Sequence, residues 1–288
     1  MNIELPTDSR ITRVIELALM EDLGAGDVTS ESIFGEEDLG FAEFLCKGEG
    51  VIAGLGVAAT VFALCDQAVR MVPSCKDGSA ALPGDRVAKV QGPVKGILQG
   101  ERTALNFLQR MSGIATLTRA YVAAVAGTKA RITDTRKTAP GLRFLDKMAV
   151  RLGGGVNHRF GLDDMVLIKD NHIAAAGSIS RAVERCVATL RTRNLHLGVE
   201  VETTSLDQVE EALAAQGVTR IMLDNLPTGV MREAVERIHG KVEVEASGGI
   251  TLANVREVAL TGVDFISIGA LTHSVRALDI SLELSHHV

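Results

Sequence analysis

Aromatic side chains are scarce in this 288-residue chain, which has no tryptophan and a single tyrosine, Tyr121. Aromatic residues make up only 3% of the sequence, too few for the stacking platforms that bind single-stranded nucleic acids. A basic excess is missing as well, because 30 Lys and Arg face 36 Asp and Glu, a formal net charge of −6. We therefore expect no nucleic-acid partner.

Cysteine motifs and long apolar runs are also missing. The four cysteines form no C-x-x-C pair and have no histidine at zinc-finger spacing, so we expect reduced thiols of a cytoplasmic protein. The first residues, MNIELPTDSR, are polar and acidic, unlike a signal peptide. The most apolar stretch, Val51–Leu64, spans about 14 residues and contains two glycines, so it is too short to cross a bilayer. No membrane association is expected.

The first part of the chain reads as a mixed domain. Apolar residues at helical spacing predict a helix over 11–21 that stops at Gly24. From Gly40 to Gln99, short apolar runs alternate with glycine and proline, which indicates a sheet with one embedded helix over 57–66. A long helix is predicted over 99–125, in which Gly113 indicates either a break or a close packing contact.

After Arg131, predicted strands and helices alternate regularly. The strands are expected at 132–134, 165–169, 197–201, 220–223, 242–246 and 265–268. Such alternation is typical of βαβ units around a parallel sheet, and we predict an incomplete α/β barrel. An open doubly wound sheet is the alternative, but no G-x-G-x-x-G follows the first strand. The predicted domains are residues 1–110 and 111–274, with 275–288 packing back on the first.

Cationic residues gather where the first two of these strands end. They are Arg136 and Lys137, Lys169, and His158 and Arg159 in the intervening GGGVNHRFG segment. In α/β barrels the active site lies at the carboxyl ends of the strands. Arginine and lysine converging there suggest a ligand with several anionic groups. The alternative is that these residues are solvated surface charges, which is a weaker explanation for the whole set than for any one of them.

Two carboxylates, Glu202 and Asp224, end the next two strands and should be neighbours at the same edge. Oxygen ligands in this arrangement suit Mg²⁺, which usually takes one or two carboxylates together with substrate phosphates. An equally good interpretation is that they cap the helices that follow. The spacing does not decide between the two.

Glycine-rich segments follow the last two strands, EASGGI over 245–250 and SIGALTHS over 267–274. Glycine lets backbone N–H groups approach a phosphate, and the loops after the last two strands are the usual phosphate site of α/β barrels. The alternative is that these glycines only form tight turns.

These motifs together resemble those of the quinolinate phosphoribosyltransferases, also called nicotinate-nucleotide pyrophosphorylases (carboxylating). The resemblance rests on DTRKTAPGLR (134–143), GGGVNHRFGL (153–162) and LIKDNHI (167–173), with further matching segments from about Ala18 to Leu284. It implies an N-terminal α/β sandwich domain and an open, incomplete α/β barrel. It also implies an enzyme of NAD biosynthesis that joins quinolinate to phosphoribosyl pyrophosphate and yields nicotinate mononucleotide, pyrophosphate and CO₂. Members of the family are dimers or larger assemblies, so a homodimer or a hexamer is expected.

The resemblance implies binding roles for individual residues. Arg102 would reach the site of a neighbouring subunit and bind a quinolinate carboxylate. The quinolinate pocket would be lined by Arg136, His158 and Arg159, with Lys137 and Lys169 between the dicarboxylate and the phosphates. Glu202 and Asp224 would face the ribose hydroxyls and Mg²⁺. The 5′-phosphate would lie against Ser247, Gly248, Gly249, Gly269 and Ala270.

Four of these residues, Lys137, Lys169, Glu202 and Asp224, are the expected catalytic groups. Carboxylates would stabilise the positive charge that develops on the ribose as pyrophosphate leaves. Lys137 is our candidate for stabilising the carbanion left by decarboxylation, and a bound water or His158 for returning a proton to it.

Three rival functions remain. A paralogue of the same fold, found with molybdate transport genes, has the TRK and HR motifs in looser form, and the intact NHR and LIKDNHI motifs here favour the quinolinate enzyme. Nicotinate phosphoribosyltransferase is longer and acts on a monocarboxylate. A non-catalytic ligand-binding or assembly subunit would not need to retain Arg136, Lys137, Glu202 and Asp224.

Overall fold

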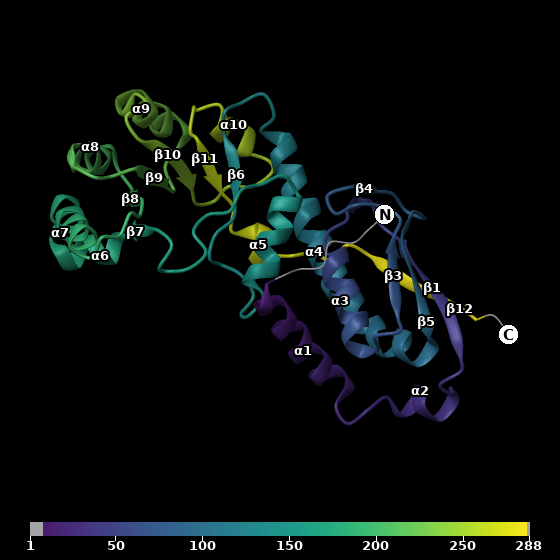
Figure 1. Cartoon of the computed structure of the whole chain (residues 1–288). Helices are drawn as coiled ribbons and strands as arrows, with labels where there is room; N and C mark the ends of the chain where they lie inside the picture. Colours follow the sequence, from purple (N-terminus) through teal and green to yellow (C-terminus); the bar gives the residue numbers. More distant parts are fainter. Residues whose placement is uncertain (1–7, 287–288) are drawn as a thin grey trace. The chain divides into compact units, whose positions relative to one another are not determined.

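The computed structural model describes residues 8–286 (Figure 1). Residues 1–7, in which a signal peptide was judged absent, and the last two residues lie outside this range. The chain forms two compact units. The second consists of Ala120–Lys137 and Gly155–Ala270, and the first of the remainder. The segment Thr138–Gly154, expected from the sequence in the barrel, clusters with the first unit.

An antiparallel sheet in the order β12-β1-β5-β3 forms the centre of the first unit. Its strands are β1 (Leu39–Cys46), β3 (Arg70–Pro73), β5 (Arg86–Pro93) and β12 (Ile280–His286), and a separate pair is formed by β2 (Gly50–Val51) and β4 (Ala80–Ala81). The chain's last strand, β12, pairs with β1 along its full length. Helix α3 (Leu55–Cys65) contacts β3, and its Phe62 meets Phe44 of β1 edge to face.

The helices of the first unit begin and end where local chemistry dictates. Asp8 caps α1 (Ser9–Leu23) by accepting a hydrogen bond from the Arg10 N–H, and Gly24 ends it. Asp27 caps the short α2 (Val28–Ile33), which the sequence did not predict. Helix α5 (Arg143–Leu152) also belongs to this unit.

The long helix α4 (Val94–Ala124) is unbroken at Gly113. A Cβ atom at Gly113 would collide with the backbone of Arg276 and Ala277, the segment that leads to β12. Gln109 fixes the same segment, because its carbonyl accepts from the Leu278 N–H at 3.0 Å and its side chain donates to Ile280 O at 2.7 Å. Gly113 is therefore a close packing contact and not a break.

A parallel sheet in the order β6-β11-β10-β9-β8-β7 forms the second unit. The strands are β6 (Arg131–Thr133), β7 (Val166–Ile168), β8 (Val199–Thr203), β9 (Arg220–Asp224), β10 (Glu243–Ser247) and β11 (Phe265–Ser267). Within residues 8–286 the two edge strands, β6 and β7, do not pair, so the barrel is open, as predicted.

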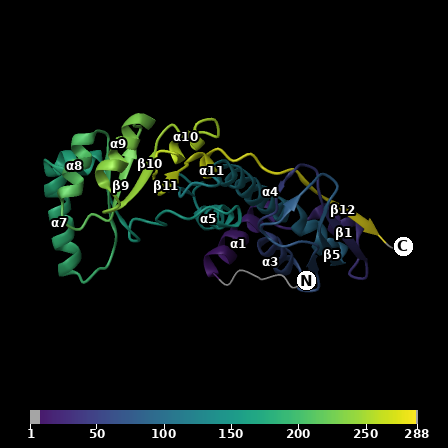
Figure 2. The same cartoon turned by 90° about the horizontal axis from the view of Figure 1, so that it is seen from above.

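Helices follow these strands and cover one side of the sheet. They are α6 (Asp170–Ala176), α7 (Ile179–Thr192), α8 (Leu206–Ala214), α9 (Thr228–Ile238) and α10 (Val255–Ala259); the next helix along the chain, α11 (Ala270–His273), belongs to the first unit from residue 271 on. Helices α7, α8 and α9 lie side by side along the outer face (Figure 2). Ile221, Leu223, Val244 and Ala246 point to this face and are buried. Within the described range, no helix is long and apolar enough to span a bilayer.

We predict that Gly113→Ala destabilises the protein by about 1–3 kcal/mol, because the added methyl group has no room against the Arg276 backbone. Thermal unfolding would measure the loss. Gly229→Ala is the matched control, since this exposed glycine of α9 has nothing within 4 Å of an added Cβ. Equal melting temperatures for the two variants would contradict the packing role of Gly113.

Candidate active site

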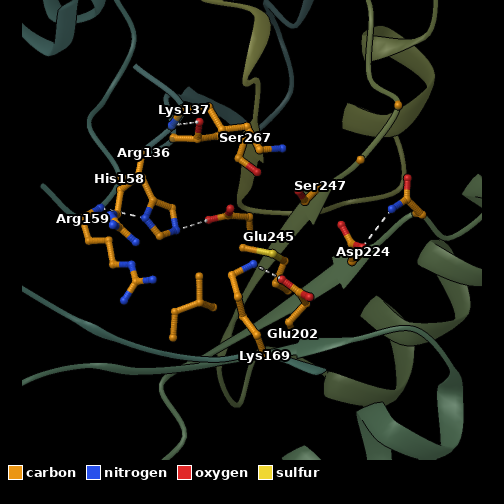
Figure 3. Close-up of a pocket in the computed structure, with 16 residues that line it drawn as sticks. Arg136, Lys137, His158, Arg159, Lys169, Glu202, Asp224, Glu245, Ser247 and Ser267 are labelled. Atoms are coloured by element: carbon orange, nitrogen blue, oxygen red, sulfur yellow. Dashed lines mark hydrogen bonds and ion pairs between the residues drawn. The ribbon is translucent and has the colours of Figure 1, made fainter. Parts of the chain in front are cut away.

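A cavity of about 650 Å³ opens at the carboxyl edge of the parallel sheet (Figure 3). Most residues singled out from the sequence line it: Arg136, Lys137, His158, Arg159, Lys169, Glu202, Asp224, Ser247, Gly248 and Gly249. Gly269 and Ala270 follow β11 but do not line this cavity, and Arg102 lies exposed on α4 in the first unit.

The alternation of side chains along the strands explains which residues reach the cavity. On β8, Glu200 and Glu202 share one face, and on β10 Glu245 and Ser247 do so, because successive side chains of a strand point to opposite sides. In each pair, the residue nearer the carboxyl end of the strand, Glu202 or Ser247, lies beside the cavity mouth. The other residue of each pair, Glu200 or Glu245, lies deeper inside the open barrel and is fully buried.

The cationic residues form one wall of the cavity. Arg159 donates from Nη1 to the Met165 carbonyl at 3.0 Å. Burial and, to a smaller extent, the neighbouring charge of Arg136 lower the pKa of the Arg159 guanidinium. An anionic ligand would relieve the repulsion between these two charges. The solvated-surface interpretation is therefore the weaker one.

His158 is held rigidly beneath this wall. The buried Asp134 at the end of β6 accepts from the His158 backbone N–H at 2.9 Å and from the Asn157 side chain at 2.5 Å. The Arg159 N–H donates to Nδ1 of the ring at 2.7 Å, and Nε2 lies 3.0 Å from Glu200 Oε2. The hydrogen bonds on both ring nitrogens fix its orientation.

Glu202 and Asp224 line the opposite wall. Lys169 Nζ lies 2.5 Å from Glu202 Oε2, and the Asn225 side chain donates to Asp224 Oδ2 at 2.8 Å. The capping interpretation is wrong, because Ser205 caps α8 and Pro227 occupies the cap position of α9. Two carboxylates on adjacent strands, both reaching the cavity, are a donor set that fits Mg²⁺ bound together with a phosphorylated substrate.

The loop after β10 follows a path that requires glycine. Gly248 has φ +91° and Gly249 has φ +62°, and a Cβ on Gly248 would collide with the Asn225 side chain. Both residues line the cavity, so their backbone lies within reach of a ligand. The turn interpretation and the phosphate interpretation are thus compatible here.

Two buried carboxyl groups beneath the cavity received no role from the sequence. Glu200 and Glu245 are both 0% exposed, and burial raises the pKa of each to about 7. Only Glu245 lines the cavity. The signal that could have found it is its place two residues before Ser247 on the same strand. Thr135 and Asn225, which follow predicted strands, also line the cavity, as does Ser267, although no role was predicted for these three residues.

Comparison with known proteins decides the family. The profile of the quinolinate phosphoribosyl transferase N-terminal domain matches residues 27–112, and that of the C-terminal domain matches residues 114–283. The chain belongs to the quinolinate phosphoribosyltransferase family.

Individual members of the family are similar over almost their whole length. A quinolinate phosphoribosyltransferase [decarboxylating] 1b of Nicotiana tabacum is 49% identical over 286 residues, covering 94% of this chain and 81% of the relative. A probable nicotinate-nucleotide pyrophosphorylase [carboxylating] of Bacillus subtilis is 44% identical, with 96% and 94% coverage. The crystal structure of NadC from Streptococcus pyogenes matches with a TM-score of 0.93 and 39% identity, covering 100% of both chains.

Proposed function

We propose that this chain transfers the phosphoribosyl group of phosphoribosyl pyrophosphate to quinolinate and decarboxylates the adduct. The products are nicotinate mononucleotide, pyrophosphate and CO₂, and the enzyme serves the synthesis of NAD in the cytoplasm. One observation carries the proposal: a single cavity has cations on one wall, carboxylates on another and a glycine loop on the same edge. Family membership supports the same reaction.

In this proposal each wall binds one part of the substrates. Arg136 and Arg159 hold the two carboxylates of quinolinate, since planar guanidinium groups suit carboxylate geometry. The 5′-phosphate lies against Ser247, Gly248 and Gly249. Lys169 lies between the quinolinate carboxylates and the phosphates, and it neutralises part of the negative charge of the leaving pyrophosphate. Gly269 and Ala270, which lie outside the cavity lining, have a weaker claim to the phosphate.

Positive charge develops at the anomeric carbon as pyrophosphate leaves, and the carboxylates of Glu202 and Asp224 stabilise it. The pyridine nitrogen then attacks that carbon. Its position is fixed because Arg136 and Arg159 bind the two carboxylates of the same ring. The ring nitrogen becomes positively charged, which eases loss of the adjacent carboxylate. Glu202 and Asp224 would hold Mg²⁺, which supplies charge neutralisation of the leaving pyrophosphate when bound.

The decisive experiment is a product assay with quinolinate, phosphoribosyl pyrophosphate and Mg²⁺, in which nicotinate mononucleotide is followed by chromatography. We expect product that depends on quinolinate and disappears when EDTA is added. Replacing quinolinate by nicotinate is the control for acceptor specificity. If phosphoribosyl pyrophosphate binds but quinolinate gives no product, the acceptor is wrong and the paralogue function takes its place.

Lys137 is proposed to stabilise the carbanion that forms when CO₂ leaves. It lies at the cavity, directly after Arg136. Lys137→Ala should lower kcat by about 10²-fold or more while KM for quinolinate changes little, because the charge acts mainly in the transition state. Turnover within a few-fold of the unmodified enzyme would refute this role.

Arg102 is proposed to complete the site of a neighbouring subunit in a homodimer or a hexamer. Arg102→Ala and Lys169→Ala should each be nearly inactive on their own. Because a symmetric interface pairs residues from different subunits, each mixed dimer would carry one intact site and one site that lacks both residues. Random reassembly makes about half of the dimers mixed, so about a quarter of the activity should return. The measurement is activity after dissociation and reassembly of the mixture. No recovery, with mixed dimers shown to form, would place Arg102 in its own subunit's site or outside any site.

A further inference from the structure

Beneath the cavity, four charged or titratable groups gather in the interior of the parallel sheet. His158 Nε2 lies 3.0 Å from Glu200 Oε2 and 3.5 Å from Glu245 Oε2. One side-chain atom each of His158, Glu200 and Glu245 lies within 4.8 Å of the corresponding atoms of the other two. Arg220 of β9 approaches Glu245 Oε2 with Nη1 at 3.2 Å. Glu200, Glu245 and Arg220 have no part in the reaction proposed so far, whereas His158 was a candidate for returning the proton to the ring.

This cluster retains a proton near neutral pH. Two carboxyl groups this close together in a fully buried place disfavour two negative charges, which favours a proton on one of them. No N–H or O–H donor within residues 8–286 reaches Oε1 of Glu200 or Oε1 of Glu245, so two full negative charges would leave buried oxygens unsatisfied. Burial and the Glu200 charge raise the pKa of Glu245 to about 7, against the opposite effect of His158, Ser267 and Arg220. Glu245 is therefore partly protonated at pH 7.

A metal ion is a poorer occupant of this cluster, although its histidine and two carboxylates lie close enough to ligate one. The Arg220 guanidinium is ion-paired to Glu245, and a divalent cation would lie next to that positive charge. The contact between His158 Nε2 and Glu200 also has hydrogen-bond length. A shared proton is consistent with both the Arg220 ion pair and the short contact between His158 and Glu200, whereas a metal ion is consistent with neither.

The ring of His158 is badly placed to act as the acid for a ligand in the cavity. Its Nδ1 accepts from the Arg159 N–H, so in the neutral ring the proton is on Nε2. That nitrogen lies 3.0 Å from Glu200 Oε2 and 3.5 Å from Glu245 Oε2, and Figure 3 shows it directed at Glu245. Of the two glutamates, Glu245 lines the cavity and Glu200 does not.

We propose that Glu245 is the general acid that protonates the ring carbon of the nucleotide after CO₂ leaves, with His158 and Glu200 as positioning residues. This inference rests on the proposed function. The bond between the ring carbon and the departing carboxylate breaks, and its electron pair stays on the carbon beside the charged nitrogen. That pair takes the proton of Glu245, which becomes a carboxylate. Arg220 and His158 then stabilise the new charge, and solvent returns a proton before the next turnover.

The test is Glu245→Gln, which keeps the shape and polarity of the buried side chain but has no acidic proton. In a single turnover the variant should release pyrophosphate within a few-fold of the unmodified rate. Conversion of the nucleotide that still carries both carboxylates into nicotinate mononucleotide should slow by about 10²-fold or more, because general acids contribute about that much. The intermediate should therefore accumulate and be visible by rapid quench and chromatography.

Glu243→Gln is the matched control, because Glu243 belongs to the same strand and also contacts Arg220, at 2.7 Å, but is exposed. It should leave both steps unchanged. Glu245→Asp, which restores an acid at the same position, should recover part of the second step.

Three results would overturn the inference. The nucleotide product could keep pace with pyrophosphate in Glu245→Gln, or both steps could slow equally, which would indicate a structural effect. If the unmodified enzyme released no pyrophosphate with quinolinate, the proposed function would fail first and the inference with it.

The pH dependence of the second step gives a readout that a merely structural role would not change. An acid must be protonated to act, so conversion by the unmodified enzyme should fall about tenfold per unit of pH once the pH exceeds the pKa of Glu245, about 7. In Glu245→Gln that decline should disappear and leave a low, flat rate. A decline that persists unchanged in the variant would contradict the assignment.

Discussion

Everything at the active site depends on the strict alternation of side chains along parallel strands. One side of β8, β9 and β10 presents Val201, Ile221, Leu223, Val244 and Ala246, all buried. The other side presents acids, a serine and a methionine to the sheet interior. A register shift of one residue would reverse every position, moving carboxylates among the helices and aliphatic groups into the cavity. The same rule that builds the core thus places the chemistry.

That arrangement makes the sheet interior unusually polar, and its charges have to be balanced. Glu200 and Glu245 are fully buried, which is costly unless they are paired or protonated. Arg220 supplies part of the balance through Glu243 and Glu245 and packs its guanidinium 4.0 Å from the Phe265 ring centre. The retained proton supplies the rest. A group kept protonated for structural reasons is then available beside a cavity in which the proposed reaction needs an acid.

Sequence reasoning found the outer layer of the site and missed the inner one. Arg136, Lys169, Glu202 and Asp224 lie at or just beyond the carboxyl ends of strands, where polar residues are conspicuous, so they were predicted. Glu245 lies within a strand and looks like part of its alternating pattern. The sequence did not show that Ser205, and not Glu202, caps α8. The cap depends on backbone geometry, which the spacing of residues does not specify. Residues 275–288 were predicted to pack back on the first domain, but no local pattern specifies that β12 pairs with β1, more than two hundred residues away.

The most direct test of the account is a crystal structure of the enzyme with nicotinate mononucleotide bound. The account predicts the phosphate against Gly248 and Gly249, the ring carboxylate between Arg136 and Arg159, and the ribose facing Glu202 and Asp224. It also predicts that the ring carbon that lost its carboxylate, next to the ring nitrogen, faces Glu245. A nucleotide bound away from the carboxyl edge of the sheet, or with its phosphate among the arginines, would contradict it.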